Sequence, residues 1–246
     1  MRVVLILSAG MPRAGSGWHY NLIHDLVVAS GGQNARSIRK QYHLQRYLTE
    51  VNCNISTLNP HRLLPVFLPA MMGKKYAIKT HAGPSKLVQW LHRKEAISII
   101  YIFRDPRAAM LSAYEYGRRA LDNDRPNAFS QLTTLDSAAE FMQFYIRIWR
   151  AWSKLDGILL VRYEDLVRDF DVEIERLMEY LGMTSNNGDA EPVLDQYRPE
   201  RGNAERKGTH FSKGQIERFR DVFTSAELER FTAMFEPDLG CMGYSK

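Results

Sequence analysis

The chain has 246 residues, of which 45% are hydrophobic and 25% are charged. This length is sufficient for one large α/β domain, and we expect a single domain over residues 1–246 rather than two small ones. Lys and Arg number 33 against 28 Asp and Glu, which gives a formal net charge of +5. This mild excess suits a small anionic ligand and gives no support to a nucleic-acid partner.

The cysteines and the apolar segments argue against several other classes. Cys53 and Cys241 have no neighbouring CxxC or Cys/His pair, so neither a disulfide framework nor a zinc site is indicated, and a reducing, cytoplasmic location fits best. The opening MRVVLILSAG resembles a signal peptide, but its apolar stretch is at or below the usual length, and we interpret it as a buried strand. No segment approaches the roughly 20 apolar residues of a membrane-spanning helix, so we expect a soluble protein.

The predicted elements begin with a strand at 3–7, where the run VVLIL is typical of a strand covered on both faces. A helix is predicted from 17 to 29, because apolar residues recur at helical spacing and SGG follows as a stop. The sequence therefore predicts a strand, a glycine-containing turn and a helix in direct succession.

Further strands are predicted at 75–80, 97–103 and 158–163, and helices at 141–152 and 166–182. Because strands alternate with helices, we expect an α/β fold with three layers, α/β/α, around a central parallel sheet. We interpret the apolar and aromatic stripes of these helices as core.

Three stretches are less regular, at 33–73, 118–135 and 184–212. Long irregular insertions in a compact domain often form lids or binding loops. We expect the pocket for an acceptor substrate to lie in these insertions.

The turn after the first strand reads SAGMPRAGSGWHY and has the glycine spacing of a phosphate-binding loop. A turn of this kind presents backbone N–H groups and the positive end of a helix dipole to an anion. Gly10 and Gly15 stand five apart as in GxxxxGK[ST], but Ser16 and Gly17 follow where that pattern has Lys and Ser or Thr. The positive charge is instead inside the loop, at Arg13; a plain strand-to-helix turn is the alternative interpretation.

The order PRAGSGW resembles the 5′-phosphosulfate loop of sulfotransferases, in which Pro, Lys or Arg, a small residue, Gly, two small residues and often Trp follow one another. The resemblance implies that the loop binds the 5′ end of the donor nucleotide and that Trp18 lies against the adenine. The residues it assigns are Arg13, Ala14, Gly15, Ser16, Gly17 and Trp18.

The tripeptide Lys79, Thr80 and His81 follows a predicted strand and resembles the Lys-Thr-His of cytosolic sulfotransferases. The resemblance implies that His81 is the catalytic base and that Lys79 steadies the sulfuryl oxygens. Without the family, a lone His at a strand end is an ordinary surface or core residue.

Two more motifs fit the same family. Arg104 follows the strongest predicted strand and Ser112 lies eight residues later, which resembles the pair that binds the 3′-phosphate. Tyr163 in VRYEDL resembles the tyrosine that contacts the adenine. The alternatives are a solvated helix start for Arg104 and Ser112 and a buried strand-end tyrosine for Tyr163.

The C-terminal phosphate-binding element departs from the family pattern and has two competing registers. ERKGTH contains a literal Arg206-Lys207-Gly208, whereas FSKGQIERFRDVFT keeps the family spacing with Ser212 in place of Arg and Phe219 in place of Trp. We prefer the second register, which assigns Lys213 and Gly214 to the nucleotide, with Arg206 supplying a guanidinium from a neighbouring turn.

The family implies a single α/β domain related to the P-loop nucleotide folds. It uses 3′-phosphoadenosine 5′-phosphosulfate (PAPS) as donor, releases 3′-phosphoadenosine 5′-phosphate (PAP) and requires no metal. We expect in-line sulfuryl transfer to a small-molecule or carbohydrate acceptor, with Arg13 stabilising the leaving phosphate and His81, at a pKa near neutrality, as base. A carboxylate from an insertion could replace His81 as the base.

The alternative functions are a P-loop kinase that uses ATP and a non-catalytic nucleotide-binding protein. The sequence identifies neither the acceptor nor the oligomeric state.

Overall fold

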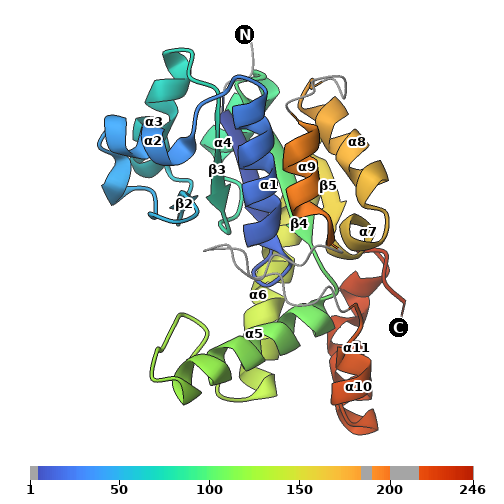
Figure 1. Ribbon diagram of the computed structural model, residues 1–246. Coiled ribbons are helices and arrows are strands. Elements are labelled where there is room, and N and C mark those ends of the chain that lie inside the picture. Colours follow the sequence, from blue (N-terminus) through green and yellow to red (C-terminus); the bar gives the residue numbers. More distant parts are fainter. Residues whose placement is uncertain (1–4, 184–189, 200–215, 246) are drawn as a thin grey trace.

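The computed structural model describes residues 5–183, 190–199 and 216–245. At its centre is a five-stranded parallel sheet with the strand order β2-β3-β1-β4-β5 (Figure 1). The strands are β1 (Leu5–Gly10), β2 (Asn54–Ile55), β3 (Tyr76–Thr80), β4 (Ile97–Phe103) and β5 (Leu159–Arg162).

Helices cover both faces of this sheet. Because parallel crossovers share one hand, the connection from β1 to β2 and the oppositely directed connection from β3 to β4 place their helices on opposite faces. The expected three-layer α/β/α fold is confirmed. The helices are α1 (Ser16–Ala29), α2 (Ala35–Gln41), the 3₁₀ helix η1 (Leu44–Arg46), α3 (Pro60–Met71), α4 (Lys86–Arg93), α5 (Pro106–Asp122), α6 (Leu135–Ser153), α7 (Tyr163–Arg168), α8 (Phe170–Tyr180), α9 (Glu191–Tyr197), α10 (Phe219–Val222) and α11 (Ser225–Leu239).

The predicted strands agree closely with those observed, and the main difference is in β1. This strand continues to Gly10 instead of ending at residue 7, since Ser8 to Gly10 stay paired with β4. The small side chains of these residues give no apolar signal, although the backbone is buried throughout β1. The carboxyl end of the strand therefore lies directly beneath the loop.

The helices differ more from the prediction. The helix expected at 166–182 is two helices, α7 and α8, separated at Asp169, whose φ of −124° and ψ of 50° are not helical. The irregular stretch 33–73 contains α2, η1, β2 and α3. Helix α3 carries two internal prolines, which obscure a helix that Asn59 caps and Pro60 begins.

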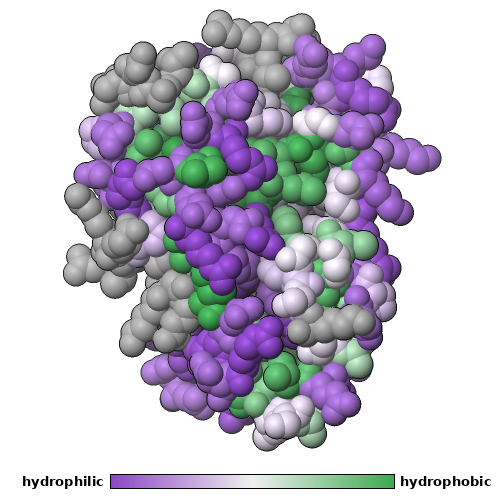
Figure 2. Space-filling model, turned by 90° about the vertical axis from the view of Figure 1, so that its right-hand side faces the viewer, coloured by the Kyte–Doolittle hydropathy of each residue, from purple (hydrophilic) through white to green (hydrophobic). Residues whose placement is uncertain are grey.

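The carboxyl ends of the strands face a second group of helices, in which α5 and the first part of α6 lie below the sheet in Figure 1, next to α10 and α11. Arg150 on α6 forms an ion pair with Asp238 on α11. The side of the molecule that carries α8, α10 and α11 exposes mainly hydrophilic side chains, with apolar patches between them (Figure 2). The space between the strand ends and α5 is where the sequence motifs meet.

Candidate functional site

A pocket of about 300 Å³ lies at the carboxyl ends of β1, β3 and β4. Ten of the eleven candidate site residues within the described ranges line it; the exception is Ala14, whose side chain is buried in the core. The sixteen lining residues include no carboxylate. They are Pro12, Arg13, Gly15, Ser16, Gly17, Trp18, Asn52, Lys79, His81, Arg104, Ser112, Tyr116, Asn127, Ala128, Phe129 and Tyr163.

The loop between β1 and α1 is shaped by residues with positive φ. Arg13 has a φ of 63°, and Gly15, the N-cap of α1, has a φ of 72°. A Cβ at Gly15 would lie 2.7 Å from the ring of Tyr163, so glycine is required for that ring to pack on the loop. Gly15 has no side chain to cap the helix, so the first N–H groups of α1 present a positive helix end to the pocket.

Arg13 is held from one side by aromatic rings. Its guanidinium carbon lies 4.3 Å from the ring centre of Tyr116 and 5.8 Å from that of Phe129. Arg13 Nε donates a hydrogen bond of 3.2 Å to Ser112 Oγ. Burial lowers the pKa of Arg13 to about 10, so the side chain stays charged at neutral pH.

Lys79 lies at the end of β3, in register with Ser8 of β1. It is 7% exposed, and within the described residues its ammonium group has no ion-pair partner. Burial, together with the nearby charge of Arg13, lowers its pKa to about 8. A buried cation without a counterion is costly, and an anion in the pocket would offset that cost.

His81 follows β3 and faces the same pocket. Its Nδ1 donates a 2.6 Å hydrogen bond to the Gly10 carbonyl, which can only accept, so Nε2 is left without a proton. Burial, together with the Lys79 charge, lowers the pKa of His81 to about 3. The expectation of a pKa near neutrality was therefore wrong, because desolvation outweighs the Gly10 hydrogen bond. His81 is a neutral proton acceptor at pH 7.

Arg104 and Tyr163 come together as the motifs predict. The guanidinium carbon of Arg104 lies 4.5 Å from the ring centre of Tyr163, and its Nε is 3.9 Å from Glu164 Oε1. Ser112 lines the same pocket from α5, where its hydroxyl accepts from Arg13. The guanidinium groups of Arg13 and Arg104 and the Ser112 hydroxyl can therefore bind an anion at this end of the pocket.

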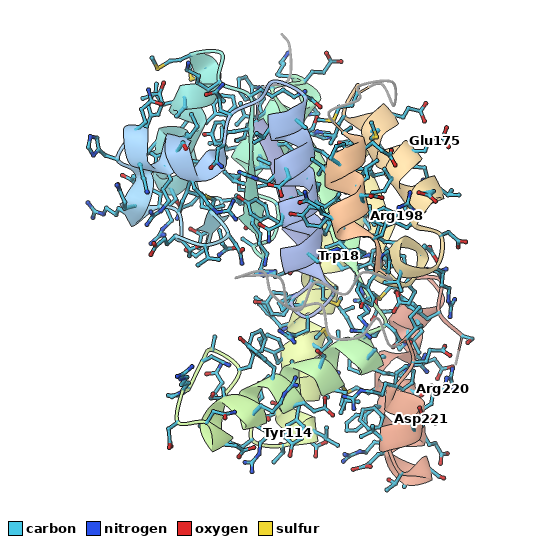
Figure 3. All side chains as sticks on the ribbon, viewed as in Figure 1. Trp18, Tyr114, Glu175, Arg198, Arg220 and Asp221 are labelled. Atoms are coloured by element: carbon cyan, nitrogen blue, oxygen red, sulfur yellow. The ribbon has the colours of Figure 1, made fainter. Side chains whose placement is uncertain are left out.

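Trp18 lies at the pocket end of α1, toward α9 (Figure 3). It is 1% exposed, its Nε1 donates to the Tyr197 carbonyl at 3.2 Å, and its ring stacks on Phe170 with centres 6.2 Å apart. These contacts fix the indole at the pocket wall. Its predicted contact with adenine stays a prediction.

Five lining residues were not found from the sequence: Asn52, Tyr116, Asn127, Ala128 and Phe129. All but Tyr116 come from two of the three stretches expected to form binding loops, 33–73 and 118–135, although no position there carried a motif. Asn52 Oδ1 is buried and has no hydrogen-bond partner within the described residues. An unpaired buried amide oxygen in a pocket wall is a feature that only the tertiary structure reveals.

The predicted C-terminal element, Arg206, Lys213 and Gly214, lies outside the described residues, as does most of the stretch 184–212. Within the described residues, no group of three or more His, Cys, Asp or Glu side chains is placed to hold a metal ion. None of the helices in the described part of the chain is long and apolar enough to span a membrane.

The family model of the sulfotransferase domain matches residues 4–243. The chain belongs to the sulfotransferase domain family. Among curated proteins, this sulfotransferase-domain chain is 22% identical to mouse Sulfotransferase 4A1 over 170 residues, which cover 66% of the chain and 59% of that protein. It is 21% identical to mouse Sulfotransferase 6B1 over 89% of the chain and 70% of that protein. The chain thus spans about three fifths of the length of mouse and rat Sulfotransferase 4A1.

Solved structures share the fold. Mouse sulfotransferase SULT7A1, complexed with PAP, superposes with a TM-score of 0.63 and 17% identity, covering 97% of this chain and 85% of that one. A retinol dehydratase in complex with androsterone and the inactive cofactor PAP gives a TM-score of 0.62, also at 17% identity, covering 97% of this chain and 81% of that one. At such identities the likeness establishes the sulfotransferase fold alone.

Proposed function

We propose that the protein is a PAPS-dependent sulfotransferase, which transfers a sulfuryl group to a hydroxyl or amine of an acceptor and releases PAP. The observation that carries this proposal is the convergence of Arg13, Lys79 and Arg104 on a pocket without a carboxylate lining, with a neutral His81 at its floor. This donor set fits a ligand with several anionic groups. Two solved structures of the same fold are complexes with PAP, which supports the same donor here.

The phosphosulfate would supply an activated sulfuryl group, and the protein would supply charge, orientation and a base. The α1 N-terminus with residues 13–18 would hold the 5′ end, Arg104 and Ser112 the 3′-phosphate, and Tyr163 with Trp18 the adenine. Arg206, Lys213 and Gly214 complete the proposed set from outside the described residues.

His81 is the proposed catalytic base, because its unprotonated Nε2 lies on a ring that the Gly10 carbonyl orients. It would accept the acceptor proton at Nε2 while Nδ1 keeps its own. Arg13 and Lys79 would stabilise negative charge on the donor oxygens, and Arg13 acts mainly as a fixed charge since it releases a proton only near pH 10. Within the described residues no Asp or Glu lines the pocket as a rival base.

The acceptor is proposed to be a small molecule or carbohydrate. Retinol dehydratase, which shares this fold, has been solved in complex with androsterone and with retinol, and this supports a small molecule. The aromatic wall of Tyr116 and Phe129 suits an apolar one. A cytoplasmic location and the absence of a nucleic-acid partner belong to the same proposal.

The test is an acceptor screen in which the full chain is incubated with PAPS or, in parallel, with ATP and Mg²⁺. We expect products heavier by one sulfuryl group, formed together with PAP, only in the PAPS arm. Phosphorylated products in the ATP arm would identify a kinase. Tight PAP binding without turnover of any acceptor would indicate a non-catalytic nucleotide-binding protein.

A further inference from the structure

Helix α3 carries a stripe of exposed apolar side chains. Leu64, Leu68, Met71 and Met72 are 51%, 52%, 69% and 61% exposed. At about 100° per residue, these four positions occupy one stripe about 100° wide, turned away from the buried side of the helix. The other six large apolar side chains that are exposed in the described residues lie on six different helices. Within the described residues, exposed large apolar side chains are therefore concentrated on α3.

The stripe belongs to a basic part of the chain. Residues 33–75, here called the α2–α3 lobe, contain seven Lys or Arg and one Glu, a net charge of +6, whereas the whole chain carries +5. In the structure α2, η1 and α3 lie together beyond β2 at one edge of the sheet (Figure 1). Lys40 and Arg46 are exposed on this lobe. An apolar stripe and a local positive charge therefore belong to one lobe.

The positive charge of the α2–α3 lobe determines which kind of partner can cover the apolar stripe. A symmetric contact with a second copy would bring two lobes of +6 against each other, which opposes association. A membrane surface rich in anionic lipids has the opposite charge and can take apolar side chains into its interface. We propose that the α2–α3 lobe docks reversibly on anionic membrane surfaces, with Leu64, Leu68, Met71 and Met72 entering the interface.

Docking through this lobe leaves the pocket free. Helix α3 leaves β2 near the carboxyl ends of the strands and returns to the start of β3, where the Tyr76 hydroxyl donates to the Val66 carbonyl. Met71 and Met72 therefore lie toward the amino ends of the strands, whereas the pocket lies at the carboxyl ends. The inference is independent of the proposed function.

The test is co-sedimentation of the full chain with phosphatidylcholine vesicles that either contain or lack phosphatidylserine. The wild type should bind only the phosphatidylserine vesicles, and less as salt rises. The double variant Leu68→Gln, Met71→Gln should lower the partition coefficient about tenfold or more. Val172→Gln is the matched control, since Val172 is 58% exposed on α8; it should stay near wild type.

A second pair of changes, Lys40→Glu with Arg46→Glu, tests the charge separately and should also reduce binding to the phosphatidylserine vesicles. A circular dichroism spectrum and a melting temperature that match the wild type would show that each variant is folded. The proposal is overturned if the wild type fails to bind phosphatidylserine vesicles, or if Val172→Gln lowers binding as much as the double variant. It is also overturned if the double variant converts a wild-type dimer into a monomer in light scattering, which would make α3 a contact between copies.

Discussion

Two cations and one neutral imidazole meet at the pocket floor, and burial sets the state of each. Burial lowers the pKa of Lys79 to about 8, that of Arg13 to about 10 and that of His81 to about 3. At pH 7 the pocket therefore offers two positive charges beside an unprotonated base. A bound polyanion stabilises the cations it contacts, so ligand binding and the charge of Lys79 are coupled.

The pKa of Lys79 predicts how PAP affinity depends on pH. The anion prefers the protonated ammonium, which is lost as the pH rises through about 8 in the free protein. PAP affinity should therefore fall by up to about tenfold per pH unit above pH 8, and binding there should take up a proton. Calorimetry in buffers of different ionisation enthalpy measures both effects. In Lys79→Met the weakened affinity should lose this pH dependence; an unchanged slope in that variant would assign the titration to another group.

Tyr116 is expected to position Arg13. Tyr116→Leu removes the ring 4.3 Å from the guanidinium, an interaction of about 0.5–2 kcal/mol, so kcat should fall about 2- to 30-fold with little change in acceptor KM. Tyr114→Leu is the matched control, because Tyr114 points away from the sheet on the same helix (Figure 3) and does not line the pocket. Equal losses of kcat in both variants would mean that Tyr116 only stabilises α5.

At the scale of elements, the strand, loop and helix from β1 to α1 form the unit that the sequence predicted best. Its signals are local: an apolar run, a glycine pattern and helical spacing. The wall opposite the loop could not be predicted, because Tyr116 and Phe129 meet Arg13 only through the packing of α5 and its following loop. The break between α7 and α8 was missed as well, because the apolar spacing continues across Asp169.

The loop depends on Gly15 for two separate reasons that substitution can distinguish. Gly15→Ala combines an unfavourable φ of 72° with a Cβ 2.7 Å from Tyr163, and should lower the free energy of unfolding by about 2–4 kcal/mol and PAP affinity about tenfold. Gly31→Ala shares a φ of 82° but meets no atom within 4 Å, so it should cost only about 1 kcal/mol and leave PAP affinity unchanged. Denaturation and PAP titration of the two variants provide the measurement. Similar PAP affinities in both would refute the packing of Tyr163 on the loop.

At the scale of the molecule, residues distant in sequence support the pocket from behind. The Tyr244 hydroxyl donates to Glu164 Oε2 at 2.7 Å, while the Asp105 N–H donates to Oε1 at 3.2 Å. Glu164 in turn lies 3.9 Å from Arg104. The YEDL motif identified Tyr163, but no sequence signal connects the C-terminal Tyr244 to its neighbour Glu164. The order and spacing of the sequence motifs thus predicted the residues that line the pocket. The contacts behind these residues, such as that of Tyr244 with Glu164, depend on the tertiary structure.

The hydrogen bond from Tyr244 to Glu164 predicts the effect of substituting Tyr244. Burial raises the pKa of Glu164 and the Tyr244 hydrogen bond lowers it, so Tyr244→Phe should favour the protonated carboxyl and release Arg104 from its partner. PAP affinity should fall about 2- to 10-fold. Tyr180→Phe removes a comparable hydroxyl, which donates to the Ile99 carbonyl at 2.8 Å and does not line the pocket. If Tyr180→Phe weakens PAP binding equally, the effect of Tyr244 is one of general stability.

The most direct test of the account is acceptor-dependent formation of PAP from PAPS by the wild type and by His81→Gln, measured together with PAP affinity. The account predicts a fall in kcat of about 10²-fold or more in His81→Gln, with the dissociation constant for PAP within about threefold of wild type. His92→Gln, which alters a histidine bonded to the Ile97 and Asp156 carbonyls outside the pocket, should keep wild-type turnover. Turnover by His81→Gln equal to that of the wild type would contradict the assignment of His81 as the base.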